Sequence, residues 1–293
     1  MAALNHRLGA EITRRGLLLG GAALAASVAG CSSPSPLPSS VRKPAAYTFT
    51  NLVSTNPFFV AHRGGGRNWP EMTAYAYDQA AALPYVKAIE ISVVVSSDGV
   101  LVCSHDPNTI RVTGVDHDIE KTPWSTLSEL MVTAHETDDP SQPARPLTRF
   151  DDVIDAHLKN LVCFIEPKTR LTAELLLERM IAAGHPERVV WKQPITSGRF
   201  SKAKEAGFHT WGHGMDESRL PMLARWAADP NIDMLGVGLD QPDSVFRDTV
   251  QAAKANGKKV MTWPVMAPAE KVRVLQLGIS GLMTSDIVHV PSG

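Results

Sequence analysis

The 293-residue chain has little cysteine, no excess of charge of either sign and no long apolar run. Three cysteines are too few for a disulfide-stapled scaffold, so the fold must rest on a packed core. With 29 Lys and Arg against 30 Asp and Glu, the chain lacks the basic surface typical of nucleic-acid binding. No apolar run reaches the roughly 18–20 residues of a spanning helix. The 44% of hydrophobic residues supply core for one large domain or two small ones.

The first thirty residues are typical of an export signal. Arg14 and Arg15 precede a Leu/Ala/Gly-rich run over 16–30 that is too short to span a bilayer. The paired arginines resemble the twin-arginine motif, and the Val-Ala-Gly before Cys31 resembles a bacterial lipoprotein cleavage box. We therefore expect export, lipidation of Cys31 and anchoring to the outer face of the bacterial cytoplasmic membrane. An N-terminal helix with an incidental cysteine is the alternative.

Three segments are expected along the chain. Residues 1–30 form the export signal, 31–56 carry the acylated Cys31 and a Pro/Ser-rich tether, and 57–293 form the folded domain. The prolines stiffen the tether, which has too few apolar residues to bury a core.

The folded domain alternates apolar runs with helical patterns. Strands are expected at 58–61, 88–95, 100–103, 161–165, 189–191, 209–211, 234–237, 259–263 and 281–284. Helices are expected at 73–83, 150–158, 172–183, 198–206, 217–228, 244–256 and 269–277. About eight βαβ units over about 250 residues favour a closed (β/α)8 barrel over an open sheet. The chain has no Gly-x-Gly-x-x-Gly after its first strand, which argues against a Rossmann fold. Cys103 and Cys163 are expected to be buried thiols, and 134–146 to be a surface loop.

Chemistry in such a barrel lies where the strands end. The first strand ends in His62, Arg63 and three glycines, and Glu71 follows before the first helix. Glycines let backbone N–H groups approach an anion, Arg63 offers a fork for phosphate, and His62 can move protons near neutral pH. An ordinary turn with a capping glutamate explains the same residues.

The second strand carries Glu90 and Ser92 on one face. An Asp-Gly pair at 98–99 predicts a two-residue hairpin turn. That register places Ser92 opposite His105 and gathers Glu90, Ser92 and His105 on one face. A buried structural histidine is the alternative, and a longer turn shifts the register.

Other strand ends supply further candidates. Glu166 and Lys168 share one face and can form an ion pair, at the site or at an ordinary surface. Trp263 can wall a pocket or simply pack. His209 and His213 lie four apart, but a metal site there is not expected on a strand.

The ordered set of motifs resembles the glycerophosphodiester phosphodiesterase family, over about residues 58–287. The matching positions are His62-Arg63-Gly64, Pro70-Glu71-x-Thr73, Glu90-Ile91, Asp98-Gly99, His105-Asp106, Arg111-x-Thr113-Gly114, Thr126–Leu130, Glu166-x-Lys168, Trp263 and Gly278–Asp286. The resemblance implies a (β/α)8 barrel of the phosphatidylinositol-phosphodiesterase-like kind. It also implies hydrolysis of glycerophosphodiesters to an alcohol and glycerol 3-phosphate, assisted by Ca²⁺ or Mg²⁺.

The resemblance implies a role for each matching side chain. His62 and His105 become the acid–base pair; Glu90, Glu166 and Glu71 hold the metal or stand beside it; Arg63, Lys168, Ser92 and Trp263 contact the substrate. The family carries Glu-x-Asp where this chain has Ser92, and asparagines where it has Met72 and Met266. A non-catalytic lipoprotein that binds a phosphorylated ligand, and a phospholipase-D- or C-like lyase that forms a cyclic phosphate, are the two alternatives.

Overall fold

The structure is a computed structural model that describes residues 46–133, 139 and 141–292. The predicted export signal, Cys31 and most of the tether lie outside these residues. The predicted surface loop over 134–146 lies partly outside them. Its last two residues, Arg145–Pro146, form the short strand β5, which pairs with β4 (Met131–Val132). The end of that expected loop is therefore strand.

Within the described residues, eight parallel strands close into a barrel, which confirms the predicted (β/α)8 fold. They pair in the order β1–β11–β10–β9–β8–β7–β6–β2, and the pairing of Ala61 with Ile89 closes the ring. The strands are β1 (Phe58–Ala61), β2 (Ala88–Val95), β6 (Val162–Pro167), β7 (Val189–Pro194), β8 (His209–Met215), β9 (Met234–Gly238), β10 (Lys259–Val265) and β11 (Gly281–Thr284).

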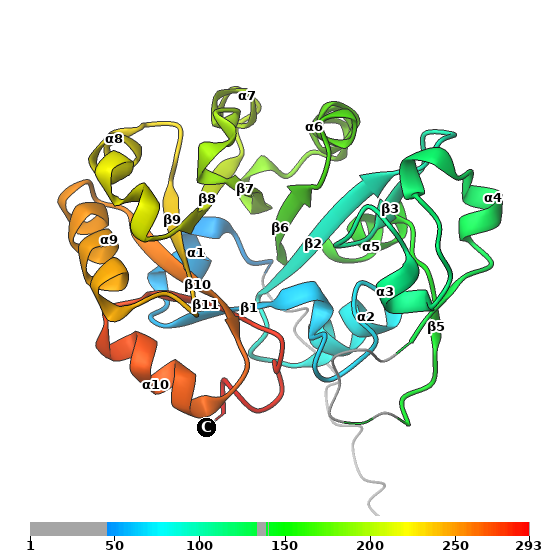
Figure 1. The fold of residues 1–293 in the computed structure, drawn as a ribbon, viewed down its shortest axis with the longest axis horizontal. Helices are drawn as coiled ribbons and strands as arrows, with labels where there is room; N and C mark the ends of the chain where they lie inside the picture. Colours follow the sequence, from blue (N-terminus) through cyan, green and yellow to red (C-terminus); the bar gives the residue numbers. More distant parts are fainter. Residues whose placement is uncertain (1–45, 134–138, 140, 293) are drawn as a thin grey trace, which may run out of the picture. The chain divides into compact units, whose positions relative to one another are not determined.

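Helices surround the strands (Figure 1). The longer ones are α2 (Ala74–Ala82), α5 (Phe150–His157), α6 (Arg170–Ala183), α7 (Phe200–Glu205), α8 (Leu223–Ala228), α9 (Asp243–Ala255) and α10 (Pro268–Gln276). Each lies in a segment predicted to be helical. The segment 217–228 divides into a 3-10 helix, η5 (Glu217–Met222), and α8, because Pro221 has no N–H for an α-helical hydrogen bond. In the described ranges, every helix is too short or too polar to cross a bilayer.

The hairpin between β2 and β3 (Leu101–Cys103) has a different register from the predicted one. Val93 pairs with Cys103, so Ser92 lies beside Ser104, whose N–H donates to the Ser92 carbonyl at 3.0 Å. The predicted pairing of Ser92 with His105 is therefore wrong by one residue.

A three-residue turn causes this shift. The Ser96 N–H donates to the Val100 carbonyl at 2.8 Å, which leaves residues 97–99 in the turn. The Asp98 carboxylate accepts hydrogen bonds from the Ser96 hydroxyl at 2.6 Å and the Trp124 N–H at 3.0 Å. These side-chain bonds favour the wider turn over the two-residue turn expected from Asp-Gly alone.

The barrel interior has an apolar floor and a polar mouth. The floor is a buried cluster that includes Phe58, Val60, Ala88, Val162, Phe164, Val190, Met234, Met261 and Met283. The mouth is formed by Glu90, Ser92, Glu166, Lys192 and His213, which follow on the same inward-facing positions of β2, β6, β7 and β8. The same alternation therefore supplies apolar packing at one end and charged groups at the other.

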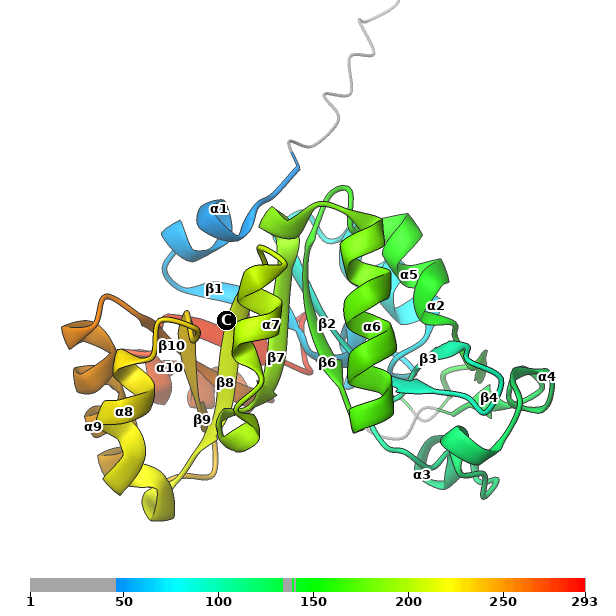
Figure 2. The same ribbon diagram turned by 90° about the horizontal axis from the view of Figure 1, so that it is seen from above.

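Helix α1 (Phe49–Ser54) packs against the floor, where Phe49 and Leu52 are buried. Figure 2 shows it at the opposite end of the barrel from α3 (Ile110–Thr113). Residues 49–54 were assigned to the tether by sequence, so the packed part of the chain begins earlier than the predicted boundary after residue 56. Cys103 and Cys163 are free and buried, as predicted.

Candidate active site

Three neighbouring strands bring a buried charge cluster to the barrel mouth. The β2–β6 register pairs Ser92 with Glu166, and the β6–β7 pairing brings Lys192 beside Glu166. Glu90 lies two residues before Ser92 and therefore points to the same interior face. Their side chains are almost completely buried, at 0% exposure for Glu90, 5% for Glu166 and 3% for Lys192.

The Lys192 ammonium bridges the two glutamates. Its Nζ lies 2.8 Å from Oε1 of Glu90 and 2.7 Å from Oε2 of Glu166. The Ser92 Oγ lies 3.1 Å and 3.3 Å from the same two carboxylate oxygens, and its one hydrogen is donated to either. The Trp211 indole lies 5.6 Å from the ammonium, in a cation–π arrangement.

Electrostatics keep all three groups charged. Burial opposes ionisation of Glu90, but the Lys192 ammonium outweighs it and lowers the pKa of Glu90 to about 2. Burial likewise opposes ionisation of Glu166, while Lys192, with His213 and Lys168, brings the pKa of Glu166 well below its usual value. Burial disfavours the charged form of Lys192, yet the two carboxylates raise its pKa above the ordinary value. The cluster therefore stays ionised at neutral pH.

Glu71 is held by two guanidinium groups. Arg63 Nη1 lies 3.1 Å from its Oε2, and Arg111 bonds both of its oxygens, at 2.6 Å and 3.1 Å. Burial disfavours the Glu71 carboxylate, but the hydrogen bonds of Arg111 and the charge of Arg63 lower its pKa below the ordinary value. Both oxygens of Glu71, a predicted metal-site residue, are therefore engaged by arginines.

His105 lies at the end of the same network. Its Nδ1 is 2.8 Å from Asp106 Oδ1, and the other oxygen of Asp106 is 2.5 Å from Arg111 Nε. A continuous chain of ion pairs thus runs from Arg63 through Glu71, Arg111 and Asp106 to His105. Burial, Arg63 and Lys168 lower the pKa of His105, whereas Asp106 acts in the opposite direction.

His62 follows β1 directly and is buried. Its Nδ1 shares a hydrogen bond with the Ser285 hydroxyl, 2.8 Å away at the end of β11. Burial lowers the pKa of His62 to about 3, although the Glu90 carboxylate opposes the shift. His62 is therefore a neutral imidazole at pH 7.

The turn after β1 uses its amides internally. The N–H groups of Gly65 and Gly66 both donate to the His62 carbonyl, at 2.9 Å and 3.2 Å. A Cβ on Gly65 would lie 2.9 Å from Ile287 and Trp69 side-chain atoms. These glycines serve a tight turn and close packing, and the expected approach of their N–H groups to an anion is wrong.

Arg63 adopts a left-handed backbone conformation, with φ of 54°. Its N–H donates to Glu90 Oε2 at 2.9 Å. A non-glycine residue in this region is unusual and costs on the order of 1–3 kcal/mol, so surrounding contacts must hold it. Glu90 supplies one of them and thereby couples the buried charge cluster to Arg63.

Lys168, His213 and Trp263 complete the mouth. Lys168 Nζ lies 3.4 Å from Glu166 Oε1, which confirms the predicted ion pair. His213 Nε2 lies 3.2 Å from the same oxygen, and Trp263 contacts the His213 ring edge-on, with 5.2 Å between centroids. His209, at the start of β8, instead stacks on Phe49 beside the floor, at 3.8 Å between centroids.

Sequence reasoning missed five residues of this network: Lys192, His213, Asp106, Arg111 and Ser285. Lys192 was the most accessible of them, because it lies two residues after Val190 on the inward face of β7. The expected strand ended at residue 191, and the alternation was not continued. His213 was considered only as a metal ligand together with His209.

The donor set of the mouth does not fit a divalent cation. Ca²⁺ takes about six to eight oxygen ligands and Mg²⁺ about six. In the part of the chain that the structure describes, no group of three or more His, Cys, Asp or Glu side chains is arranged to hold a metal. The Lys192 ammonium occupies the space between Glu90 and Glu166, and Ser92 contributes no charge.

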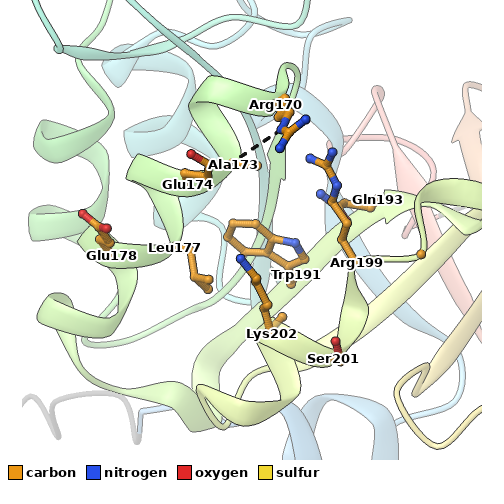
Figure 3. A pocket seen from close by; sticks show the side chains of 12 residues that line it. Arg170, Ala173, Glu174, Leu177, Glu178, Trp191, Gln193, Arg199, Ser201 and Lys202 are labelled. Carbon is orange, nitrogen blue, oxygen red and sulfur yellow. Dashed lines mark ion pairs between the residues drawn. The ribbon is translucent and has the colours of Figure 1, made fainter.

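A separate hollow lies outside the barrel, between α6 and α7. Figure 3 shows Arg170, Glu174, Arg199 and Lys202 around it, with Trp191 at its base. Trp191 points away from the barrel interior, since its neighbour Lys192 points inward. This hollow therefore contains none of the predicted site residues.

Comparisons with known proteins agree with this site. The model of the glycerophosphoryl diester phosphodiesterase family matches residues 62–289. The glycerophosphodiester phosphodiesterase GDPD6 of Arabidopsis thaliana is 37% identical over 97 residues, which are 31% of this chain and 24% of that protein. The match thus spans about a quarter of that relative's length.

Solved structures share the fold at low identity. A glycerophosphoryl diester phosphodiesterase from Parabacteroides distasonis has a TM-score of 0.65 and 17% identity, covering 84% of this chain and 91% of that one. The Thermotoga maritima glycerophosphodiester phosphodiesterase has a TM-score of 0.63 and 20% identity, covering 80% and 96%. An Oleispira antarctica phosphodiesterase, solved with the product sn-glycerol-3-phosphate, has a TM-score of 0.64 and 20% identity, covering 82% and 98%. The chain belongs to the glycerophosphoryl diester phosphodiesterase family.

Proposed function

We propose that the chain hydrolyses glycerophosphodiesters to an alcohol and glycerol 3-phosphate at the barrel mouth. One observation carries the proposal: His62 and His105 are each held by a fixed partner, Ser285 or Asp106, beside Arg63. Two oriented imidazoles next to a cationic group suit acid–base cleavage of an anionic ester. Family membership supports the same reaction class.

Arg63 and Lys168 bind the phosphate in this proposal. A phosphodiester carries one negative charge that repels a nucleophile, so cationic groups must offset it. Arg63 offers a planar fork of donors, and Lys168 adds an ammonium beside Glu166. Trp263, half-buried at the end of β10, forms an apolar wall for the glycerol or the alcohol group.

The two histidines divide the proton transfers. Water adds to phosphorus while one P–O ester bond breaks. The neutral His62 imidazole accepts the proton of the water, and protonated His105 gives a proton to the leaving alkoxide. Asp106 stabilises the His105 imidazolium through the bond to Nδ1, as a carboxylate does in other histidine-based sites.

Members of the family generally depend on a divalent metal. Ca²⁺ or Mg²⁺ remains the prediction drawn from the resemblance, with Glu90, Glu166 and Glu71 as the residues concerned. No step above passes through such an ion, because the donor set found here does not fit one.

Export and lipidation at Cys31 are part of the proposal. The twin-arginine motif and the cleavage-box residues before Cys31 support a protein anchored to the outer face of the cytoplasmic membrane. Metabolic labelling with a fatty acid is expected to mark the wild type. The Cys31→Ala variant is expected to carry no label, and equal labelling of both would contradict lipidation at this residue.

Phosphorus NMR of the purified protein with a glycerophosphodiester tests the function. The wild type is expected to convert the diester signal into that of glycerol 3-phosphate, and His105→Gln to leave the diester largely unchanged. A cyclic phosphate product would support the lyase alternative instead. Saturable binding of the diester without any product would support the non-catalytic binding protein.

A further inference from the structure

We propose that the Lys192 ammonium is the resident cation of this site and takes the position of a divalent metal between Glu90 and Glu166. The proposal concerns the same site as the proposed function but rests on that function only for its activity readout. Its basis is a positive feature of the fold: a lysine at 3% side-chain exposure that touches both carboxylates.

The first argument is occupancy. Lys192 Nζ contacts one oxygen of each glutamate at 2.8 Å and 2.7 Å, which are the lengths of charge-assisted hydrogen bonds. A metal ion bound by the same oxygens must lie between them, where the ammonium already is. The two cations therefore exclude one another.

The second argument is the cost of moving the lysine. Lys192 comes from β7, inside the barrel, and its nearest other aromatic or charged contact is the face of Trp211 at 5.6 Å. If a metal displaced the ammonium, a buried charge would lose both of its partners. A long exposed side chain could move into water, but this one is enclosed by the barrel.

The third argument is charge balance. Glu90 and Glu166 bring two negative charges, while Lys192 and Lys168 bring two positive ones. The neutral Ser92 hydroxyl lies within 3.3 Å of both carboxylates and stabilises them as a donor. A dication added to this set would leave buried, uncompensated positive charge. A neutral serine and a monovalent ammonium therefore form a matched pair.

Lys192 acts through Glu90 and is a positioning residue. It fixes Oε1 of Glu90, while Oε2 of the same carboxylate accepts the N–H of Arg63. Arg63 holds a left-handed backbone conformation next to His62. The ammonium thus helps to set the placement of the phosphate-binding arginine and the first imidazole.

Calorimetric titration of the full chain with Ca²⁺ and with Mg²⁺ tests the proposal without reference to turnover. The wild type is expected to show no saturable binding at millimolar concentrations of either ion. The Ser92→Asp/Lys192→Ser double variant, which exchanges the matched pair for a third carboxylate, is expected to gain binding of one equivalent, at least tenfold tighter than the wild type. The control Lys254→Ser removes an exposed lysine of α9 and is expected to behave like the wild type.

Binding of one equivalent of either ion by the wild type, with loss of that binding in Glu90→Gln, would overturn the proposal. The wild-type titration alone decides this if the double variant does not fold. Initial rates with and without a chelator separate the two proposals. Chelator-resistant turnover supports both, and turnover abolished by a chelator and restored by the ion overturns this one only. A wild type that neither turns over a diester nor binds an ion removes the proposed function and leaves Lys192 as the resident cation.

Discussion

The floor and the mouth of the barrel are built on the same strands, yet they are stabilised in opposite ways. At the floor, Val162 and Met283 pack by shape and apolar contact, with Phe49 of α1 closing the end. At the mouth, the next inward positions carry Glu90 and Lys192, which are stable only because each neutralises the other. A floor residue contributes through its own burial, whereas a mouth residue depends on its partners.

This difference makes the consequences of substitution different in kind. A cavity at the floor lacks contacts at every pH. A missing charge at the mouth leaves a titratable group that responds to pH. Comparing the two regions by stability, pH dependence and turnover therefore tests the account at several levels.

The largest stability effect is expected for Lys192→Met. It leaves two buried carboxylates without their ammonium, and breaking a buried pair costs about 3–5 kcal/mol. In the wild type, Lys192 lowers the pKa of Glu90 to about 2, which contributes stability above the unfolded pKa. In the variant, burial raises the pKa of Glu90, so the loss of stability grows as pH rises above the unfolded value. Urea unfolding at pH 7.5 is expected to show a larger deficit than at about pH 4.5; equal deficits would contradict the pairing.

Met283→Ala is the matched change at the floor. Met283 is completely buried, and truncation of a buried methionine costs about 2–5 kcal/mol. No titratable group is involved, so the deficit in the same urea experiment is expected to be equal at both pH values. A deficit that changed with pH as strongly as that of Lys192→Met would remove the distinction between floor and mouth.

The Asp106→Asn variant is expected to change the pH profile of turnover. Asp106 opposes the lowering of the His105 pKa, so its removal lowers that pKa further. Since His105 must be protonated to donate, kcat/KM of the wild type falls as pH rises through the His105 pKa, which lies below its ordinary 6.5. In Asp106→Asn this falling limb is expected at lower pH. A limb that stays in place, or moves to higher pH, would contradict the role of His105 as the acid.

The smallest effect is expected at an exposed ion pair. Arg170 and Glu174 of α6 lie 3.8 Å apart with side chains 80% and 62% exposed. Such pairs contribute about 0.3–0.5 kcal/mol because water screens them. Arg170→Ala is therefore expected to change the free energy of unfolding by less than about 0.5 kcal/mol. A loss as large as that of Lys192→Met would show that burial does not set the scale.

Much of the fold could be predicted because apolar alternation fixes it locally. The strands β1, β2 and β11 begin and end at the predicted residues, and Glu166 with Lys168 follows from alternation along one strand. The hairpin register could not be predicted, because the Asp98 side-chain bonds that widen the turn involve Trp124, which is distant in sequence.

The chemistry of the site was predicted by residue type more completely than by partner. His62, His105 and Glu90 were identified from strand ends and the family resemblance. The Asp106–Arg111–Glu71 chain depends on a loop that folds back over the mouth, and Lys192 depends on the parallel register of β6 and β7. Both are long-range pairings, which local patterns do not encode.

The account depends most directly on His62 and His105 acting as one acid–base pair. The decisive measurement is kcat/KM for glycerol 3-phosphate formation by His62→Gln, His105→Gln and the double variant, each verified as folded by thermal unfolding. Each single change is expected to lower kcat/KM by about 10²–10⁴-fold. The double variant is expected to be no worse than the weaker single one, since residues that act as a unit are not additive. Near-wild-type turnover in either single variant, or losses that multiply in the double, would contradict the account.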